Sequence, residues 1–155
     1  RSKFVGSIFE RDGVEVHYES LMGGLHEMNK VNVLIGDVMG SLFDLYGLAD
    51  IATVGGSFVD VGGHNPIEPA VYGLPILVGP YQHNFSEVML EFEKDGGLKT
   101  VNDSIDLQNT LDSLLSSKEK RRKMGGAAIE TIENNKGSTN QLVELLKSRI
   151  FDSSI

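Results

Sequence analysis

The chain has 155 residues, 40% of them hydrophobic, which suffices for one domain with a core of its own but not for two. Its 22 acidic and 14 basic residues give a formal net charge of −8, which opposes nonspecific binding to nucleic-acid phosphates. The sequence has no cysteine, so disulfides and cysteine metal sites are excluded, and no apolar run approaches the roughly 18 residues that span a membrane.

Short apolar strands alternate with helices along most of the chain. Strands are predicted at residues 14–18, 31–35, 50–54, 75–78 and 98–101. Helices are predicted at 2–12, 39–48, 66–72 and 84–94, with a loop at 22–30, and three more form a helical tail at 104–116, 118–134 and 138–151. Strands of this kind are typical of a parallel sheet covered by helices on both faces. We therefore expect an α/β fold with a Rossmann-like sheet, in a single domain over residues 1–155.

Two glycine pairs, Gly55-Gly56 and Gly62-Gly63, lie between the strand at 50–54 and the helix at 66–72. Ligands of open α/β sheets bind at this edge, beyond the carboxyl ends of the strands. The second pair lets the backbone approach an anion closely. Pro66 at the first helical position leaves the amides after it free to donate to a phosphate. The segment therefore predicts an anion site.

Two polar residues beside these glycines each allow two interpretations. Asn65 either caps the helix or donates to a ligand oxygen. Glu68 either complements the helix dipole in the first turn or accepts hydrogen bonds from the two hydroxyls of a ribose. Neither the G-x-G-x-x-G nor the Walker pattern is present, so these residues do not by themselves identify a nucleotide site.

Two further turns follow predicted strands, at residues 36–40 and 79–85. In the first, Asp37 is of a type that commonly caps the following helix, and Gly40 leaves room for a base or a sugar. The second carries His83 and Asn84 at the start of a helix. The four histidines lack the spacing of metal ligands and no Asp-x-Asp pair occurs, so no metal site is predicted.

Residues 118–123 hold five of the fourteen basic side chains. On a helix, such a cluster either contacts anionic lipid headgroups or forms an ordinary solvated face.

Five sequence blocks in a fixed order are more specific than any one of them. They are residues 36–40 (GDVMG), 45–50 (LYGLAD), 54–57 (VGGS), 62–70 (GGHNPIEPA), and 79–80 (GP) together with 84–85 (NF). In order and spacing they resemble the 3-deoxy-D-manno-octulosonic acid (Kdo) transferases of lipopolysaccharide synthesis. Members of that family are longer, two-domain glycosyltransferases of the GT-B type. The resemblance, which runs from about residue 31 onward, is to their C-terminal, donor-binding half.

The resemblance implies that the chain binds the donor CMP-Kdo, and that the full enzyme transfers Kdo to a lipid A precursor without a metal or other cofactor. It also implies that transfer takes place at the cytoplasmic face of the inner membrane. The 55–57 and 62–65 turns would border the phosphate and sugar, Glu68 would hold the ribose, and the 37–40 turn would approach the cytosine. The expected donor-binding residues are Asp37, Met39, Gly40, Gly55, Gly56, Ser57, Gly62, Gly63, His64, Asn65 and Glu68.

In the family, the acceptor site and the general base belong to the N-terminal domain. No catalytic residue is therefore assigned here, and the fragment by itself is expected to be inactive. The sequence departs from the family at Val38, where threonine is usual, at Ser41, where an acidic residue is common, and at Tyr81, where histidine is common. It also begins at Arg1, where the family's Arg-His-Pro donor motif would be ending.

Two other interpretations remain open. The chain could be the donor half of another GT-B enzyme that uses a UDP-sugar, because a ribose-binding glutamate is general to that architecture. It could also be a non-enzymatic nucleotide-binding or partner-docking domain, in which the glycine turns only shape an interface. A comparison of CMP with UDP binding separates the first of these from a Kdo transferase.

Overall fold

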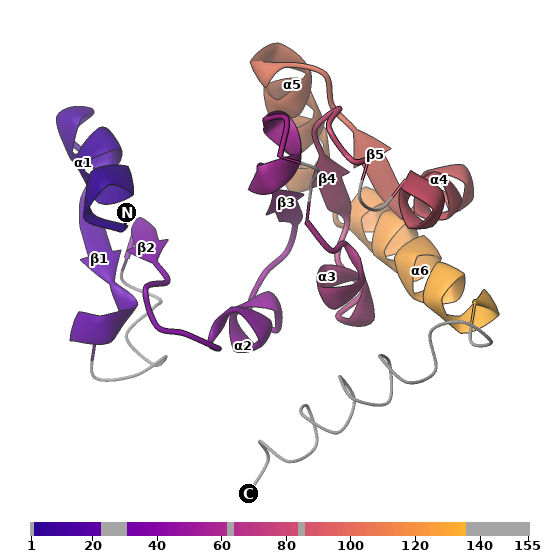
Figure 1. Cartoon of the computed structure of the whole chain (residues 1–155), viewed down its shortest axis with the longest axis horizontal. Helices are drawn as coiled ribbons and strands as arrows, with labels where there is room; N and C mark the ends of the chain where they lie inside the picture. Colours follow the sequence, from indigo (N-terminus) through magenta and orange to yellow (C-terminus); the bar gives the residue numbers. More distant parts are fainter. Residues whose placement is uncertain (1, 23–30, 62–63, 84–85, 136–155) are drawn as a thin grey trace, which may run out of the picture. The chain divides into compact units, whose positions relative to one another are not determined.

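The computed structural model describes residues 2–22, 31–61, 64–83 and 86–135. The chain forms two compact units, Arg1–Leu45 and Tyr46–Ile155, and each contains a parallel sheet of its own (Figure 1). The parallel α/β class expected from the sequence is therefore confirmed. A single domain over residues 1–155 stays a prediction.

The first unit contains α1 (Ser2–Arg11), β1 (Val16–Tyr18), a 3-10 turn η1 (Glu19–Leu21) and β2 (Val33–Ile35). Strands β1 and β2 pair in parallel, with Val16 opposite Val33. Helix α1 lies close to β1 because Gly6 has no side chain, and a β-carbon there would collide with the Tyr18 ring.

The helix predicted at 39–48 is much shorter in the structure. Helix α2 covers only Leu42–Tyr46. Gly40 has a φ of 93°, in the left-handed region that a right-handed helix cannot continue through, so the residues before α2 form a turn. The prediction was too long because apolar spacing does not reveal a backbone reversal.

The second unit contains a three-stranded parallel sheet in the order β3-β4-β5. Its elements are β3 (Ala52–Val54), η3 (Gly55–Phe58), α3 (Ile67–Val71), β4 (Ile76–Val78), α4 (Ser86–Asp95), β5 (Leu98–Thr100), α5 (Ser104–Leu115) and α6 (Lys118–Asn134). Ala52 lies opposite Ile76, and Ile76 lies opposite Leu98. All three residues of β4 are fully buried, as expected for the central strand of a parallel sheet.

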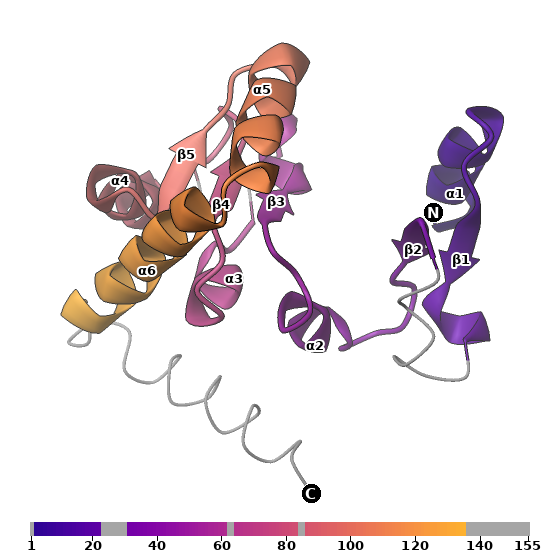
Figure 2. The ribbon, with the colours of Figure 1, turned by 180° about the vertical axis from the view of Figure 1, so that it is seen from behind.

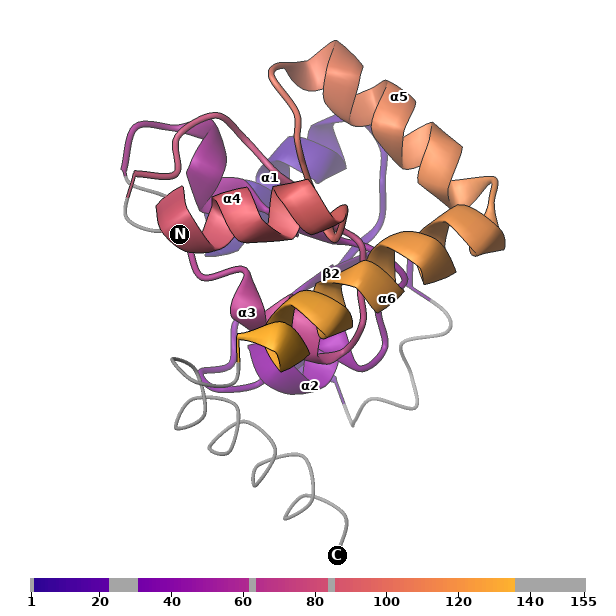
Figure 3. The same cartoon turned by 90° about the vertical axis from the view of Figure 1, so that its right-hand side faces the viewer.

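Helices α4 and α6 lie side by side in the second unit, and α5 joins the N-terminal end of α6 (Figures 2 and 3). Two glycines allow α6 to approach the sheet and its connections. A β-carbon on Gly97 would lie 2.6 Å from the backbone of Ala128, and one on Gly125 would overlap the Gly73 carbonyl. Backbone contacts of this kind fix the position of α6.

The two tail helices begin where the sequence predicts. The Asp103 carboxylate accepts from the Asp106 amide at 2.8 Å and caps α5. The Ser117 hydroxyl accepts from the Lys120 amide at 3.3 Å and caps α6. The helix predicted at 138–151 lies outside the described residues. None of the helices within the described ranges combines the length and the apolar character needed to cross a lipid bilayer.

Candidate functional site

Ser57 joins the turn after β3 to the loop after β4 by hydrogen bonds. Its side chain is wholly buried. Its hydroxyl donates to the Val54 carbonyl and accepts from the Gly79 amide at 2.7 Å. Its own carbonyl accepts from the Tyr81 amide at 2.9 Å. Ser57, predicted as a donor-binding residue, therefore has its hydroxyl occupied within the protein and acts as a positioning residue for this edge.

Gly79 brings the ends of β3 and β4 into backbone contact. A β-carbon on Gly79 would overlap the Ser57 carbonyl and lie 2.8 Å from the α-carbon of Phe58. Because β3 and β4 are parallel neighbours, both turns lie at the carboxyl edge of the sheet, where α/β proteins bind ligands.

His64 lies at this edge of the sheet, against the turn after β3. Gly62 and Gly63 lie outside the described residues. His64, which follows them, is exposed, and its ring lies against Gly56. A β-carbon on Gly56 would be 2.5 Å from the Cε1 and Nδ1 atoms of that ring. The structure thus places His64 against Gly56, which follows Gly55, and the binding of a donor by these residues stays a prediction.

Asn65 caps the start of α3, which was one of its two possible roles. Its Oδ1 accepts from the Ile67 amide at 3.0 Å, and the helix begins at Ile67 with Pro66 just before it. No partner of the Asn65 Nδ2 is found among the described residues, so this group keeps its capacity to donate to a ligand oxygen.

Glu68 is half-buried in the first turn of α3 and has no hydrogen-bond or ion-pair partner among the described residues. Burial, together with the negative charge of Glu68, raises the pKa of the Tyr46 hydroxyl above its ordinary value. The Tyr46 ring in turn lies 6.5 Å from the ring of Tyr72, centroid to centroid. A carboxylate can accept two hydrogen bonds, as many as the two hydroxyls of a ribose donate.

The remaining predicted residues, Asp37, Met39 and Gly40, lie in the first unit. The Asp37 carboxylate accepts from the amide of Ser20 at 2.9 Å and from its hydroxyl at 2.8 Å, and these bonds hold the Asp37 pKa below its usual value. Asp37 therefore does not cap α2, which begins only at Leu42, and that interpretation was wrong. Met39 is fully exposed and Gly40 is exposed beside it.

The sequence analysis missed Ser20 and Gln82. Ser20 follows β1 as Asp37 follows β2, so the parallel pairing of the two strands could have indicated their contact. The Gln82 Nε2 donates to the Gly79 carbonyl and, at 3.3 Å, to the Thr100 hydroxyl. It thereby joins the loop after β4 to the end of β5, and no sequence pattern indicates this bond.

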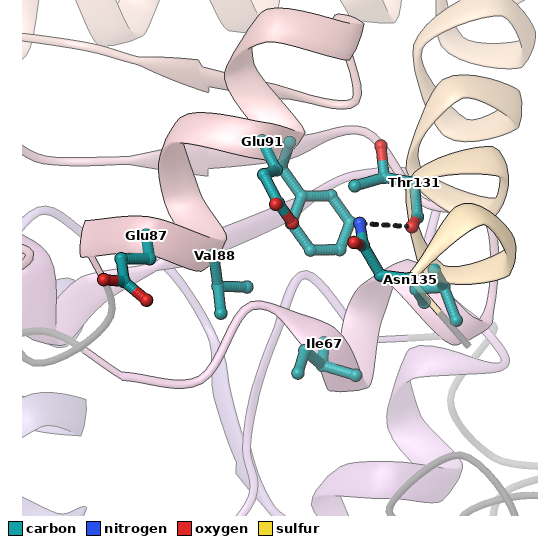
Figure 4. Close-up of a pocket in the computed structure, with 8 residues that line it drawn as sticks. Ile67, Glu87, Val88, Glu91, Thr131 and Asn135 are labelled. Carbon is teal, nitrogen blue, oxygen red and sulfur yellow. Dashed lines mark hydrogen bonds between the residues drawn. The ribbon is translucent and has the colours of Figure 1, made fainter. Parts of the chain in front are cut away.

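A cavity of about 180 Å³ lies elsewhere in the second unit, among α3, α4 and α6 (Figure 4). Its lining residues are Ile67, Glu87, Val88, Glu91, Phe92, Thr131, Ile132 and Asn135. The Asn135 Nδ2 donates to the Thr131 carbonyl at 3.0 Å across one end of it. All but Asn135, which follows α6, belong to helices, and none was predicted as a site residue.

The basic cluster at 118–123 contains one residue with a clear structural role. Arg121 Nη1 donates to the carbonyls of Leu114 and Leu115 at 2.8 and 3.0 Å, and its Nε lies 3.4 Å from Asp50 Oδ1. Asp50 precedes β3, so Arg121 lies toward the amino ends of the strands, away from the glycine turns. A contact of the cluster with lipid stays a prediction.

The described residues contain no group of three or more histidine, aspartate and glutamate side chains that could hold a metal ion. The fold is that of the C-terminal half of a GT-B glycosyltransferase. A crystal structure described as the C-terminal CMP-Kdo binding domain of WaaA from Acinetobacter baumannii matches with a TM-score of 0.77 and 27% identity, over 85% of this chain and 68% of that one.

The family described as glycosyl transferases group 1 matches residues 4–131, and the chain belongs to it. It is homologous to the 3-deoxy-D-manno-octulosonic acid transferase of Haemophilus influenzae, with 41% identity over 74% of this chain and 27% of that protein. The enzyme of the same name from Aquifex aeolicus is 37% identical over 65% of this chain and 30% of its own length. The chain thus spans less than a third of these relatives.

Proposed function

We propose that this chain is the donor-binding domain of a Kdo transferase and binds CMP-Kdo. The observation that carries the proposal is the structural likeness, over 85% of the chain, to a domain solved as a CMP-Kdo binding domain. The glycine turns after β3 and β4, joined through Ser57 and Gly79, provide the edge at which a nucleotide binds in this fold.

The residues at this edge suit the parts of a nucleotide-sugar. In the proposal, the 55–56 and 62–63 glycine turns, His64 and the Asn65 Nδ2 border the phosphate and the sugar. Glu68 accepts from the ribose hydroxyls. A contact of the turn containing Asp37, Met39 and Gly40, in the first unit, with the cytosine stays a prediction. Because CMP is the leaving group, donors directed at its phosphate stabilise the charge that develops during transfer. No metal takes part.

The full enzyme, in this proposal, transfers Kdo to a lipid A precursor at the cytoplasmic face of the inner membrane. The acceptor and the general base that activates its hydroxyl belong to a part of the enzyme outside this chain. The chain by itself therefore binds donor and does not catalyse transfer.

Calorimetric titration of the chain with CMP and with UDP tests the proposal. We expect CMP to bind more tightly than UDP. Glu68→Ala should lower CMP affinity at least about tenfold, since hydrogen bonds to a charged group contribute about 1.5–3 kcal/mol. The control Glu91→Ala removes an exposed glutamate from the α4 and α6 cavity and should change nothing.

Other results would favour the other interpretations. Tighter binding of UDP would indicate a GT-B enzyme with a UDP-sugar donor. Absence of binding to either nucleotide would contradict donor binding by this chain and favour a partner-docking domain.

A further inference from the structure

Two residues of η1, Glu19 and Ser20, form side-chain hydrogen bonds with the turn at residues 36–41 that follows β2. We propose that Glu19 and Ser20 are positioning residues, which hold this turn in the shape that selects the base of the donor nucleotide. The inference rests on the proposed function and on the prediction that the 36–41 turn approaches the cytosine. It adds two residues that need not touch the donor themselves.

Ser20 holds the beginning of the 36–41 turn. Its amide donates to Asp37 Oδ1 at 2.9 Å, and its hydroxyl donates to Asp37 Oδ2 at 2.8 Å. Because the two donors bind different oxygens of one carboxylate, they fix its orientation as well as its position. Ser20 follows β1 and Asp37 follows β2, so these bonds join the carboxyl ends of two parallel strands.

Glu19 holds the end of the same turn. Ser41 Oγ donates to Glu19 Oε2 at 2.7 Å and shares its one proton with the Val38 carbonyl at 3.1 Å. The same Glu19 oxygen lies against Gly36, where a β-carbon would be 3.5 Å from it. Glu19 and Ser41 are both half-buried. The carboxylate of Glu19 therefore contacts the first residue of the turn and binds the last.

Between these two attachments the backbone of the turn is open to a ligand. Met39 is fully exposed, and Gly40 has a φ of 93°. Among the described residues, no hydrogen-bond partner is found for the amides of Met39 and Gly40. Both amides can thus donate to a nucleobase.

Fixed amide donors suit cytosine better than uracil. Cytosine has neighbouring acceptors at O2 and N3, whereas uracil carries an N–H donor at its N3. A site whose donors are held in place rejects a base that presents another donor, and it binds the matching base without the cost of ordering the turn. The selectivity for cytosine should therefore depend on the bonds made by Glu19 and Ser20.

The charge of Glu19 by itself predicts the opposite effect on binding. A carboxylate repels the phosphate of a nucleotide, so its removal should strengthen the binding of every nucleotide alike. A positioning role predicts weaker binding of CMP and a smaller preference for it. The two explanations therefore differ in sign.

Calorimetric titration of the whole chain with CMP and with UMP, which differ only in the base, tests the inference. The parent chain should prefer CMP. Ser20→Ala and Glu19→Ala should each weaken CMP binding about two- to tenfold, the contribution of one hydrogen bond, and should weaken UMP binding less. The CMP-to-UMP affinity ratio should thus fall. Glu19→Gln keeps an acceptor for the Ser41 hydroxyl and should retain the ratio.

Two matched controls lie in the same unit. Ser7→Ala removes a hydroxyl that bonds the Phe4 carbonyl within α1, and Glu15→Ala removes an exposed carboxylate beside His17. Both should keep the parent's affinity ratio. A variant that is merely less stable loses affinity for CMP and UMP in equal proportion, so the ratio separates positioning from stability.

An unchanged ratio in both Ser20→Ala and Glu19→Ala would overturn the inference, and so would tighter binding of both nucleotides by Glu19→Ala. A parent chain that binds CMP and UMP equally would refute the inference and leave nucleotide binding by this chain intact. Absence of CMP binding by the parent chain would refute the donor proposal and, with it, the inference.

Discussion

The ring of His64 lies against the α-carbon of Gly56, so that the turn after β3 and the turn before α3 meet at one point. A β-carbon on Gly56 would be 2.5 Å from two atoms of the ring. Gly56 has no positive φ, so it is required here for space and not for an unusual backbone conformation.

We therefore expect Gly56→Ala to displace the His64 ring while leaving the stability of the protein nearly unchanged, because the ring is the free end of an exposed side chain. CMP affinity should fall by up to about tenfold, the value of one lost hydrogen bond. In a His64→Ala background, Gly56→Ala should cause no further loss of CMP affinity. A second loss of equal size there would show that Gly56 acts without His64.

Gly55→Ala is the matched control for this prediction, because the space beside Gly55 is open. The NMR shifts of the His64 ring should be unchanged in this variant. They should move in Gly56→Ala.

Ser57→Ala should destabilise the protein by about 1–3 kcal/mol, because it leaves the buried Gly79 amide without its acceptor. Urea unfolding measures the change. Ser116→Ala removes an exposed hydroxyl that bonds the Ser113 carbonyl, and it should stay within about 0.5 kcal/mol of the parent protein. Equal stabilities of the two variants would contradict the role of Ser57.

Substitution of two adjacent glycines of α6 by alanine should change the stability of the protein in opposite directions. Gly125→Ala would overlap the Gly73 carbonyl and should destabilise the protein by about 1–3 kcal/mol. Gly126→Ala faces open space and should stabilise it by about 0.5–1 kcal/mol, since alanine is the better helix former. Thermal unfolding of both variants provides the measurement. A loss of stability in Gly126→Ala would contradict the open space beside Gly126 in this position of α6.

Asp106 should contribute a pH-dependent part of the stability. Its carboxylate accepts hydrogen bonds from Lys99, from the Asn102 amide and from Thr110. These bonds lower the pKa of Asp106 below the ordinary 3.8, and the bond from Lys99 has the largest effect. A pKa lowered by folding stabilises the protein above the ordinary value, and this stability is lost as the pH falls through the folded-state pKa. Asp106→Asn should therefore lower the urea midpoint at neutral pH.

The difference between Asp106→Asn and the parent protein should shrink as the pH falls through the folded-state pKa of Asp106, because protonation then makes both side chains neutral. Asp112→Asn, on the same helix and without a side-chain partner among the described residues, should match the parent protein at neutral and at low pH. A difference for Asp106→Asn that persists at low pH would contradict the ionic origin of the effect.

The positions of the strands and of the tail helices could be predicted from the sequence. The fully apolar β4 indicates a central buried strand, and Asp103 indicates the start of α5, because burial and capping depend on residues that are neighbours in the chain. The order of the glycine blocks likewise indicates the resemblance to Kdo transferases, which the homologues at 41% and 37% identity confirm.

The turn before α2 and the contacts between loops could not be predicted in this way. Gly40 breaks the helix that apolar spacing suggests, and Asp37 binds Ser20 instead of capping α2.

The sequence by itself therefore determined the α/β class and the glycine turns that follow the strands. Only the tertiary structure decided what each of them does. Ser57 joins two strand ends through buried hydrogen bonds, Asn65 caps α3, and Gln82 links the loop after β4 to β5. The physical reason is that a side chain's role depends on which distant backbone groups lie within hydrogen-bond distance, and only the pairing of the strands sets those distances.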